Sequence, residues 1–341
     1  MPLLKLQKAS RIALKSFMGL EEGETLLVIS DEMMRDIGLS LYEAGTLIAK
    51  ESFYLEMKSR ENNGQEPPEQ ISEMMKTVDV VVAATSRSLT HTNARREASK
   101  LGVRVGTMPN ITEETMVRCL NTNSNKVVEV TEFVHGLFKD VNEIRVTSKK
   151  GTDVTFKATG RKVIPSTGIL RNIGDAGNLP SGEVYLAPIE GTTNGRLVFD
   201  GSIAGIGLLS HSVFVDVENG IATKIAGKGG EARVFGRVIN RYDDLSRTIG
   251  EFGIGTNPFA KLTGDILEDE KALGTCHFAF GNNISMGGTV DVPLHVDGII
   301  IKPTIYFDGK MIMKNGKVID LPGYNYTYVK KGEEAEDETD D

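Results

Sequence analysis

Several features are scarce in this sequence of 341 residues, and each absence excludes a class of protein. Cysteine occurs only at Cys119 and Cys276, with no CxxC pair, which excludes a disulfide framework and fits a reducing cytoplasm. No apolar run reaches about eighteen residues, so no membrane span is expected. No basic block interleaved with aromatic residues occurs, so nucleic acid is not an expected partner.

Positive charge is missing from the last ten residues, seven of which are Asp or Glu. The formal charge of −8 therefore comes mainly from this end, and the rest of the chain is close to neutral. We predict that residues 331–341 form an acidic disordered tail.

The first part of the chain alternates helical patterns with short apolar segments. The strand-like segments are TLLVIS (25–30), SFYLEM (52–57), VDVVVAAT (78–85) and VRVGTM (103–108). Continuous apolar strands between helices are typical of a parallel sheet covered on both faces. This rhythm predicts an α/β N-terminal domain with an open, mostly parallel sheet over residues 1–140.

Polar residues follow the apolar segment 78–85, at a position where α/β sheets often carry binding loops. They are Ser88, Thr90, His91 and Thr92. The alternative interpretation is structural: Thr92 caps the N-terminus of the next helix.

The second part of the chain is rich in short strands separated by Gly, Asn and Asp. Asn219-Gly220 is a favoured pair for a tight turn and predicts a hairpin between VFVDV and ATKIAG. We expect a β-rich α+β C-terminal domain over residues 141–330, and we expect it to bind metal because of the residues described next.

Five titratable residues lie in apolar, strand-like segments of this second part, where such side chains need partners. They are Glu183, Glu251, His277, His295 and Asp297. Strand alternation places His295 and Asp297 on one face, and it places His277 with Ala279 and Gly281, opposite Phe278 and Phe280. Cys276 falls on the opposite face from His277 and is expected to be a small buried hydrophobe.

Each of these residues also has a structural interpretation, as a surface or hydrogen-bonded core residue. Their recurrence in Gly-rich apolar segments favours metal ligation instead. Carboxylates and imidazoles suit one or two divalent ions such as Zn, Co, Mn or Fe, and this donor set favours a hydrolytic metal site. His135 and His211 have no neighbouring ligand types and are predicted to be structural or exposed.

Ordered motifs in the second part resemble the leucyl aminopeptidase and aminopeptidase T family of metallopeptidases. The motifs are NLPSGEVYLAP, GEFGIGTNP, DEKALGTCHFAFG and LHVDGII, with looser similarity at SLTHTNARREA. The resemblance implies a two-domain homodimer that removes N-terminal residues from peptides, with the five residues above holding two divalent ions, Zn, Co or Mn. Those ions would activate a bridging water, and Glu183 or Glu251 would be the catalytic carboxylate that moves its proton.

Two departures from the family pattern leave alternatives open. Ile284 stands where the family has a Tyr, and the segment before the HxD motif is short. Relatives of the same fold include mononuclear Fe(II) dioxygenases that open dihydroxypyridine rings, for which His277, His295 and Asp297 would form a two-His, one-carboxylate triad. The two glutamates favour the hydrolase over this alternative. A non-enzymatic metal-containing binding protein is the third hypothesis.

Overall fold

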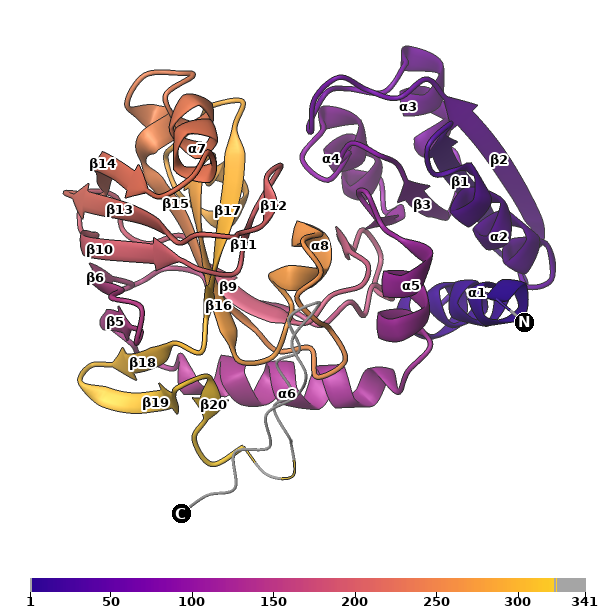
Figure 1. The fold of residues 1–341 in the computed structure, drawn as a ribbon. Coiled ribbons are helices and arrows are strands. Elements are labelled where there is room, and N and C mark those ends of the chain that lie inside the picture. The colour runs from indigo at the N-terminus through magenta and orange to yellow at the C-terminus, as the bar shows by residue number, and fades with distance from the viewer. Residues whose placement is uncertain (1, 322, 324–341) are drawn as a thin grey trace. The chain divides into compact units, whose positions relative to one another are not determined.

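The chain is described by a computed structural model for residues 2–321 and 323, and it divides into two units (Figure 1). The first unit comprises Met1–Val128 and Ser166–Ser181, and the second comprises Glu129–Pro165 and Gly182–Asp341. The first is an α/β unit with a parallel sheet and the second is a β-rich unit with antiparallel sheets. The predicted fold class is confirmed.

A five-stranded parallel sheet forms the centre of the first unit, in the order β2-β1-β3-β4-β8. Its strands are β1 Thr25–Asp31, β2 Glu51–Met57, β3 Val80–Ala84, β4 Arg104–Thr107 and β8 Ala176–Asn178. Its helices are α1 Pro2–Ile12, the short η1 Ala13–Phe17, α2 Arg35–Thr46, α3 Glu69–Met75, α4 Asn93–Lys100 and α5 Glu113–Leu120. Every residue of β3 is buried, as the apolar run predicts for a strand covered on both faces.

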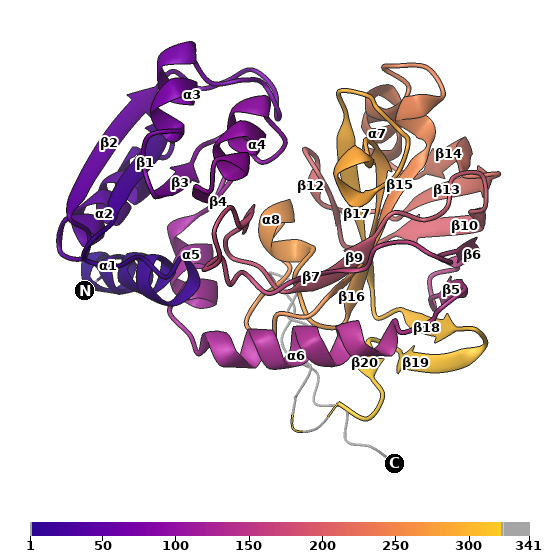
Figure 2. The same ribbon diagram turned by 180° about the vertical axis from the view of Figure 1, so that it is seen from behind.

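Two sheets make up the second unit (Figure 2). The eight-stranded sheet contains, in spatial order, β14 Ile221–Gly227, β13 Val213–Glu218, β10 Asn194–Phe199, β6 Asp153–Lys157, β5 Glu143–Thr147, β18 Thr304–Phe307, β19 Lys310–Lys314 and β20 Lys317–Val318. The seven-stranded sheet contains β12 Gly207–Leu208, β11 Ser202–Ile203, β17 His295–Ile301, β16 Thr275–Gly281, β15 Ile249–Gly255, β9 Glu183–Leu186 and β7 Ile164–Ser166. The helical elements of this part are α6 Ser124–Leu137, α7 Glu231–Ile239, η2 Leu245–Arg247, α8 Ile266–Asp269 and η3 Ile284–Met286.

Aromatic side chains join the two sheets of the second unit into one core. The ring of Phe156 on β6 lies 5.1 Å from that of Phe252 on β15 and 5.7 Å from that of Phe278 on β16. Phe199 on β10 contacts Phe280 in the same way, and all these side chains are buried. Burial of one such side chain contributes roughly 1.5–3 kcal/mol, so this core fixes one face of β15 and β16. The opposite face of these strands carries the polar residues.

The observed division differs from the predicted boundary at residue 140 in two places, each with a structural reason. The segment Ser166–Ser181 belongs to the first unit because its strand β8 extends the parallel sheet beside β4. The second unit already begins within α6, because Val130 and Val134 of that helix are part of its hydrophobic core. The predicted tail at 331–341 lies outside the described residues.

Several local predictions are confirmed. The Thr92 side chain accepts a hydrogen bond from Arg95 N and caps α4, as in the structural interpretation. Strands β13 and β14 form an antiparallel hairpin, and Asn219 and Gly220 between them both have positive φ, at 50° and 79°. Among the described residues, no helix is both long and apolar enough to span a membrane.

Candidate metal centre

Four neighbouring antiparallel strands of the second unit carry all five predicted site residues. They stand in the order β17-β16-β15-β9, with Glu183 on β9, Glu251 on β15, His277 on β16, and His295 and Asp297 on β17. Because successive side chains of a strand point to opposite faces of the sheet, these five side chains lie on the face opposite the aromatic core. The structure therefore brings together every predicted site residue.

Small residues lie opposite each of these side chains and leave them room. Glu183 pairs with Gly255, Glu251 and Asp297 both pair with Ala279, and His295 pairs with Gly281. His277 pairs with Gly253, where an added Cβ would lie 2.1 Å from His277 Nε2. Gly253 therefore lets the imidazole lie across β15, and the Gly-rich motif EFGIG has a direct role in shaping the site.

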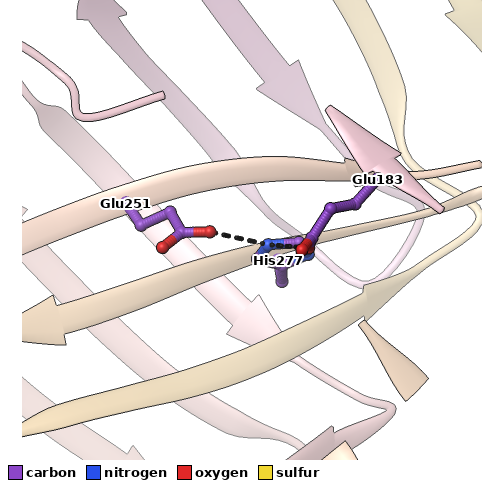
Figure 3. Close-up of side chains that lie close together, drawn as sticks. All are labelled: Glu183, Glu251 and His277. Carbon is purple, nitrogen blue, oxygen red and sulfur yellow. Dashed lines mark hydrogen bonds and ion pairs between the residues drawn. The ribbon is translucent and has the colours of Figure 1, made fainter. Parts of the chain in front are cut away.

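Glu251 is the residue to which both imidazoles point. Its Oε1 lies 3.2 Å from His277 Nε2, and its Oε2 lies 3.3 Å from His295 Nε2. His277 Nε2 is also 3.5 Å from Glu183 Oε2 (Figure 3), and His295 Nε2 is 3.6 Å from Asp297 Oδ1. Two donor groups result, Glu183–Glu251–His277 and Glu251–His295–Asp297, each with ligand atoms within 4.8 Å of one another.

The two donor groups differ from the triad that the dioxygenase alternative would use. His277, His295 and Asp297 do not form a donor group of their own among the described residues. The physical reason is the direction of the His277 ring, which crosses β15 over Gly253 toward Glu183 and Glu251. Glu251 takes the third position beside His295 and Asp297 instead.

The second ring nitrogens distinguish the two histidines. His295 Nδ1 lies 2.9 Å from the carbonyl oxygen of Asn282. Since a carbonyl only accepts, His295 Nδ1 carries the hydrogen and Nε2 is the atom that can bind a metal ion. His277 Nδ1 is buried and has no hydrogen-bond partner among the described residues. The orienting partner that metal-bound histidines almost always have is therefore present at His295 and missing at His277.

The charges of the site favour a bound cation. Burial would raise the pKa of Glu251, but hydrogen bonds from His277 and His295 hold that pKa well below its ordinary range. Burial would lower the pKa of His277, but its hydrogen bond to Glu251 and the charge of Glu183 raise the pKa to about 9. Without a metal ion the carboxylates therefore hold protons on the imidazoles, and a divalent ion fits the same place by displacing them.

Lys271 and Glu270 are two further residues of the site that neither strand alternation nor the motifs indicated. Lys271 is fully buried, and its Nζ lies 2.9 Å from Glu183 Oε1 and also pairs with Glu270. Burial would lower the pKa of Lys271, but Glu183 and Glu270 raise that pKa, so the ammonium stays charged. The available signal was the run of charges in LEDEKALG, which directly precedes the apolar strand TCHFAFG.

His135 and His211 do not belong to either donor group. Their side chains are 37% and 52% exposed and lie beside Glu132 and Glu231, respectively. The prediction that they are structural or exposed is confirmed.

Comparison with known proteins gives the family. Residues 17–320 match the model of the NicX family, described as 2,5-dihydroxypyridine 5,6-dioxygenase. The chain belongs to this family. The 2,5-dihydroxypyridine 5,6-dioxygenase of Pseudomonas putida KT2440 is 24% identical over 258 residues, which are 72% of each chain.

Two solved structures share the fold of the NicX-family chain. The structure of the P. putida dioxygenase matches with a TM-score of 0.80 and 20% identity, over 94% of this chain and 98% of that one. Wild-type AmpT from Thermus thermophilus matches with a TM-score of 0.68 and 19% identity, over 93% and 99%. The aminopeptidase resemblance is thus supported by the fold, whereas the family model and the curated relative both name the dioxygenase, the alternative of the sequence analysis.

Proposed function

We propose that this chain is a metal-dependent dioxygenase that opens a hydroxylated nitrogen-heteroaromatic ring, with one Fe(II) held by Glu251, His295 and Asp297. Membership of the NicX family over residues 17–320 carries the choice of reaction. The His295–Asn282 hydrogen bond supports the choice of donor group, because it presents Nε2 as a ligand atom.

The donor chemistry fits a divalent ion of this kind. Imidazole and carboxylate are ligands that suit iron, although the set here has one histidine and two carboxylates rather than two histidines and one carboxylate. When bound, Fe(II) supplies the redox chemistry with dioxygen that protein side chains lack. The chain holds the charge of Glu251 and Asp297 beside that ion, and His277 donates to Glu251 and fixes its orientation.

Access to solvent also differs between the two donor groups. The His295 side chain is 23% exposed, whereas His277 is fully buried. A substrate can therefore approach the group that contains His295 and Asp297. This supports the placing of the reaction at β17.

Oxygen uptake with 2,5-dihydroxypyridine as substrate tests the proposal. Protein freed of metal and reloaded with Fe(II) under nitrogen is expected to consume one dioxygen per ring opened, with loss of the ring absorbance. A His295→Ala/Asp297→Ala variant is expected to lose both signals, and a His135→Ala variant, altered at an exposed histidine, is expected to keep them. Fe(II)-loaded protein that leaves dioxygen and substrate unchanged would reject this substrate assignment.

A metallo-aminopeptidase is the second candidate function, and one observation favours it. The group Glu183–Glu251–His277 shares Glu251 with the group Glu251–His295–Asp297, an arrangement suited to two adjacent ions such as Zn, Co or Mn. AmpT shares the fold, and the site motifs resemble those of aminopeptidase T. Leucine, methionine and arginine anilides with each added ion test this activity, and turnover that survives in the His295→Ala/Asp297→Ala variant would contradict it.

Family membership favours an enzyme, and the dioxygenase in particular, over the non-enzymatic metal-binding hypothesis. The homodimer stays a prediction, and light scattering after size-exclusion chromatography measures the mass that decides it.

A further inference from the structure

We propose that the Lys271 ammonium takes the place of a metal ion beside Glu183 and thereby limits the centre to one divalent ion. The donor group Glu183–Glu251–His277 is called the Glu183 half of the centre below. This role rests on the proposed ion at Glu251, His295 and Asp297. It assigns to Glu183 an ammonium partner in place of the metal ion that the sequence resemblance implies.

The first observation is that the Lys271 ammonium is buried between two carboxylates. Lys271 Nζ is 2.9 Å from Glu183 Oε1 and pairs with Glu270, and the Lys271 side chain has no exposed surface. The Glu183 and Glu270 side chains are only 8% and 12% exposed. A buried ammonium between two buried carboxylates is a paired charge, and removing one partner of such a set leaves the others uncompensated. One oxygen of Glu183 is therefore already committed to a cation.

The backbone fixes Lys271 in this place. Asn257 N donates to Lys271 O at 2.8 Å, and Leu273 N donates to Asn257 O at 3.1 Å, so the segment after α8 is tied to the segment after β15. An added Cβ at Gly255 would lie 2.2 Å from Ala272 O, which shows how closely this segment approaches β15. The main chain of residues 271–273 is thus held against the end of β15 and the segment that follows it, and this positions Lys271.

The charge of Lys271 opposes a second ion. The ammonium lies 2.9 Å from Glu183 Oε1, so an ion bound by Glu183 and His277 would lie beside a buried positive charge. Like charges in a poorly solvated interior repel strongly. A neutral side chain at position 271 removes this repulsion and leaves the Glu183 carboxylate without its cation.

His277 supplies an independent argument. Its Nδ1 has no hydrogen-bond partner among the described residues, so a metal ion on Nε2 would leave a buried N–H without an acceptor. In the state with one ion at the His295 group and a neutral His277 with its hydrogen on Nε2, the ring donates toward Glu251 and Glu183, and only an acceptor nitrogen stays unpaired. The Glu183 half is therefore suited to hydrogen bonds and an ammonium rather than to a second ion.

Counting bound Mn²⁺ tests the proposal. Wild-type protein freed of metal is titrated with Mn²⁺ by calorimetry, and bound ions are counted by elemental analysis after gel filtration. We expect one ion per chain in the wild type and two in Lys271→Gln, with spin coupling between the two ions in the electron paramagnetic resonance spectrum. Lys271→Gln/Glu183→Gln is expected to bind one ion again. Lys261→Gln, which removes an exposed lysine of the same segment, is the matched control and is expected to bind one.

The outcomes separate this role from the proposed centre. Two ions in the wild type, or a single ion in folded Lys271→Gln, overturns the role of Lys271 while leaving the Fe(II) centre in place. No ion in the wild type, or an ion that survives in His295→Ala/Asp297→Ala, overturns the proposed centre itself and the role of Lys271 with it.

A second pair of variants keeps the test decisive if Lys271→Gln does not fold. Lys271→Met, which retains the apolar length of the side chain, is then counted in the same way. Glu183→Gln retains Lys271, and it is expected to change the Mn²⁺ dissociation constant by less than about tenfold. Loss of a residue that orients a metal ligand weakens metal binding by about tenfold or more, so the expected change lies below that range. A larger loss overturns the proposal, because Glu183 would then serve the ion directly.

Discussion

His277 makes the stability of the metal-free protein depend on pH. Its pKa in the folded protein is raised from 6.5 to about 9, chiefly by Glu251 and Glu183 acting against burial. A folded-state pKa above the unfolded one means that the folded state binds more protons, so stability falls as pH rises. The contribution is fully present below pH 6.5 and is lost as pH rises through about 9, with an upper limit of about 3 kcal/mol.

Urea denaturation in the presence of a chelator, at pH values from 6 to 9.5, measures this change in unfolding free energy. His277→Gln retains a donor of similar reach without a titratable ring, and it is expected to flatten the profile. A wild-type profile that rises with pH, or one that His277→Gln leaves unchanged, would contradict the assignment.

At the scale of the element, the segment between β16 and β17 positions His295. Glu190 accepts hydrogen bonds from Asn283 Nδ2 at 3.0 Å and Thr289 N at 2.8 Å, and it pairs with Arg161. Arg161 also donates to Gly287 O at 2.6 Å. The neighbouring carbonyl, that of Asn282, accepts the hydrogen of His295 Nδ1. The contacts that anchor this segment therefore also hold the Asn282 carbonyl, the backbone group that orients the His295 ring.

Glu190→Gln is therefore expected to weaken metal binding without removing a ligand. Loss of the ion pair with Arg161 loosens the segment and the Asn282 carbonyl, and we expect the dissociation constant for Mn²⁺ to rise by up to about tenfold. Asp216→Asn removes the ion pair with Arg196 at a more exposed position of the same unit, and it serves as the control. Equal effects of the two substitutions would show that the loss is general rather than specific to the His295 segment.

The same elements show what the sequence could and could not predict. Strand alternation and Gly-rich spacing found Glu251, His277 and the HxD pair, because these features are local. Lys271 lies outside any strand and reaches Glu183, a residue 88 positions earlier, only through the tertiary fold. Alternation also could not predict that His277 turns over Gly253 toward Glu183 and Glu251, because strand period gives a face and not a ring direction.

At the scale of the whole molecule, the donor groups lie entirely in the second unit, while the first unit has its own sheet and core. An ion that binds only the folded form stabilises the unit that holds it, by about 2.7 kcal/mol at a hundred times its dissociation constant. Amide hydrogen exchange of β15 and β16, where it proceeds through unfolding of the second unit, is therefore expected to slow about a hundredfold when Mn²⁺ is added at that concentration. Exchange of β1 and β3 in the first unit is expected to stay unchanged. His295→Ala/Asp297→Ala should abolish the slowing in β15 and β16, whereas equal slowing of all four strands would mean that the two units unfold as one cooperative body.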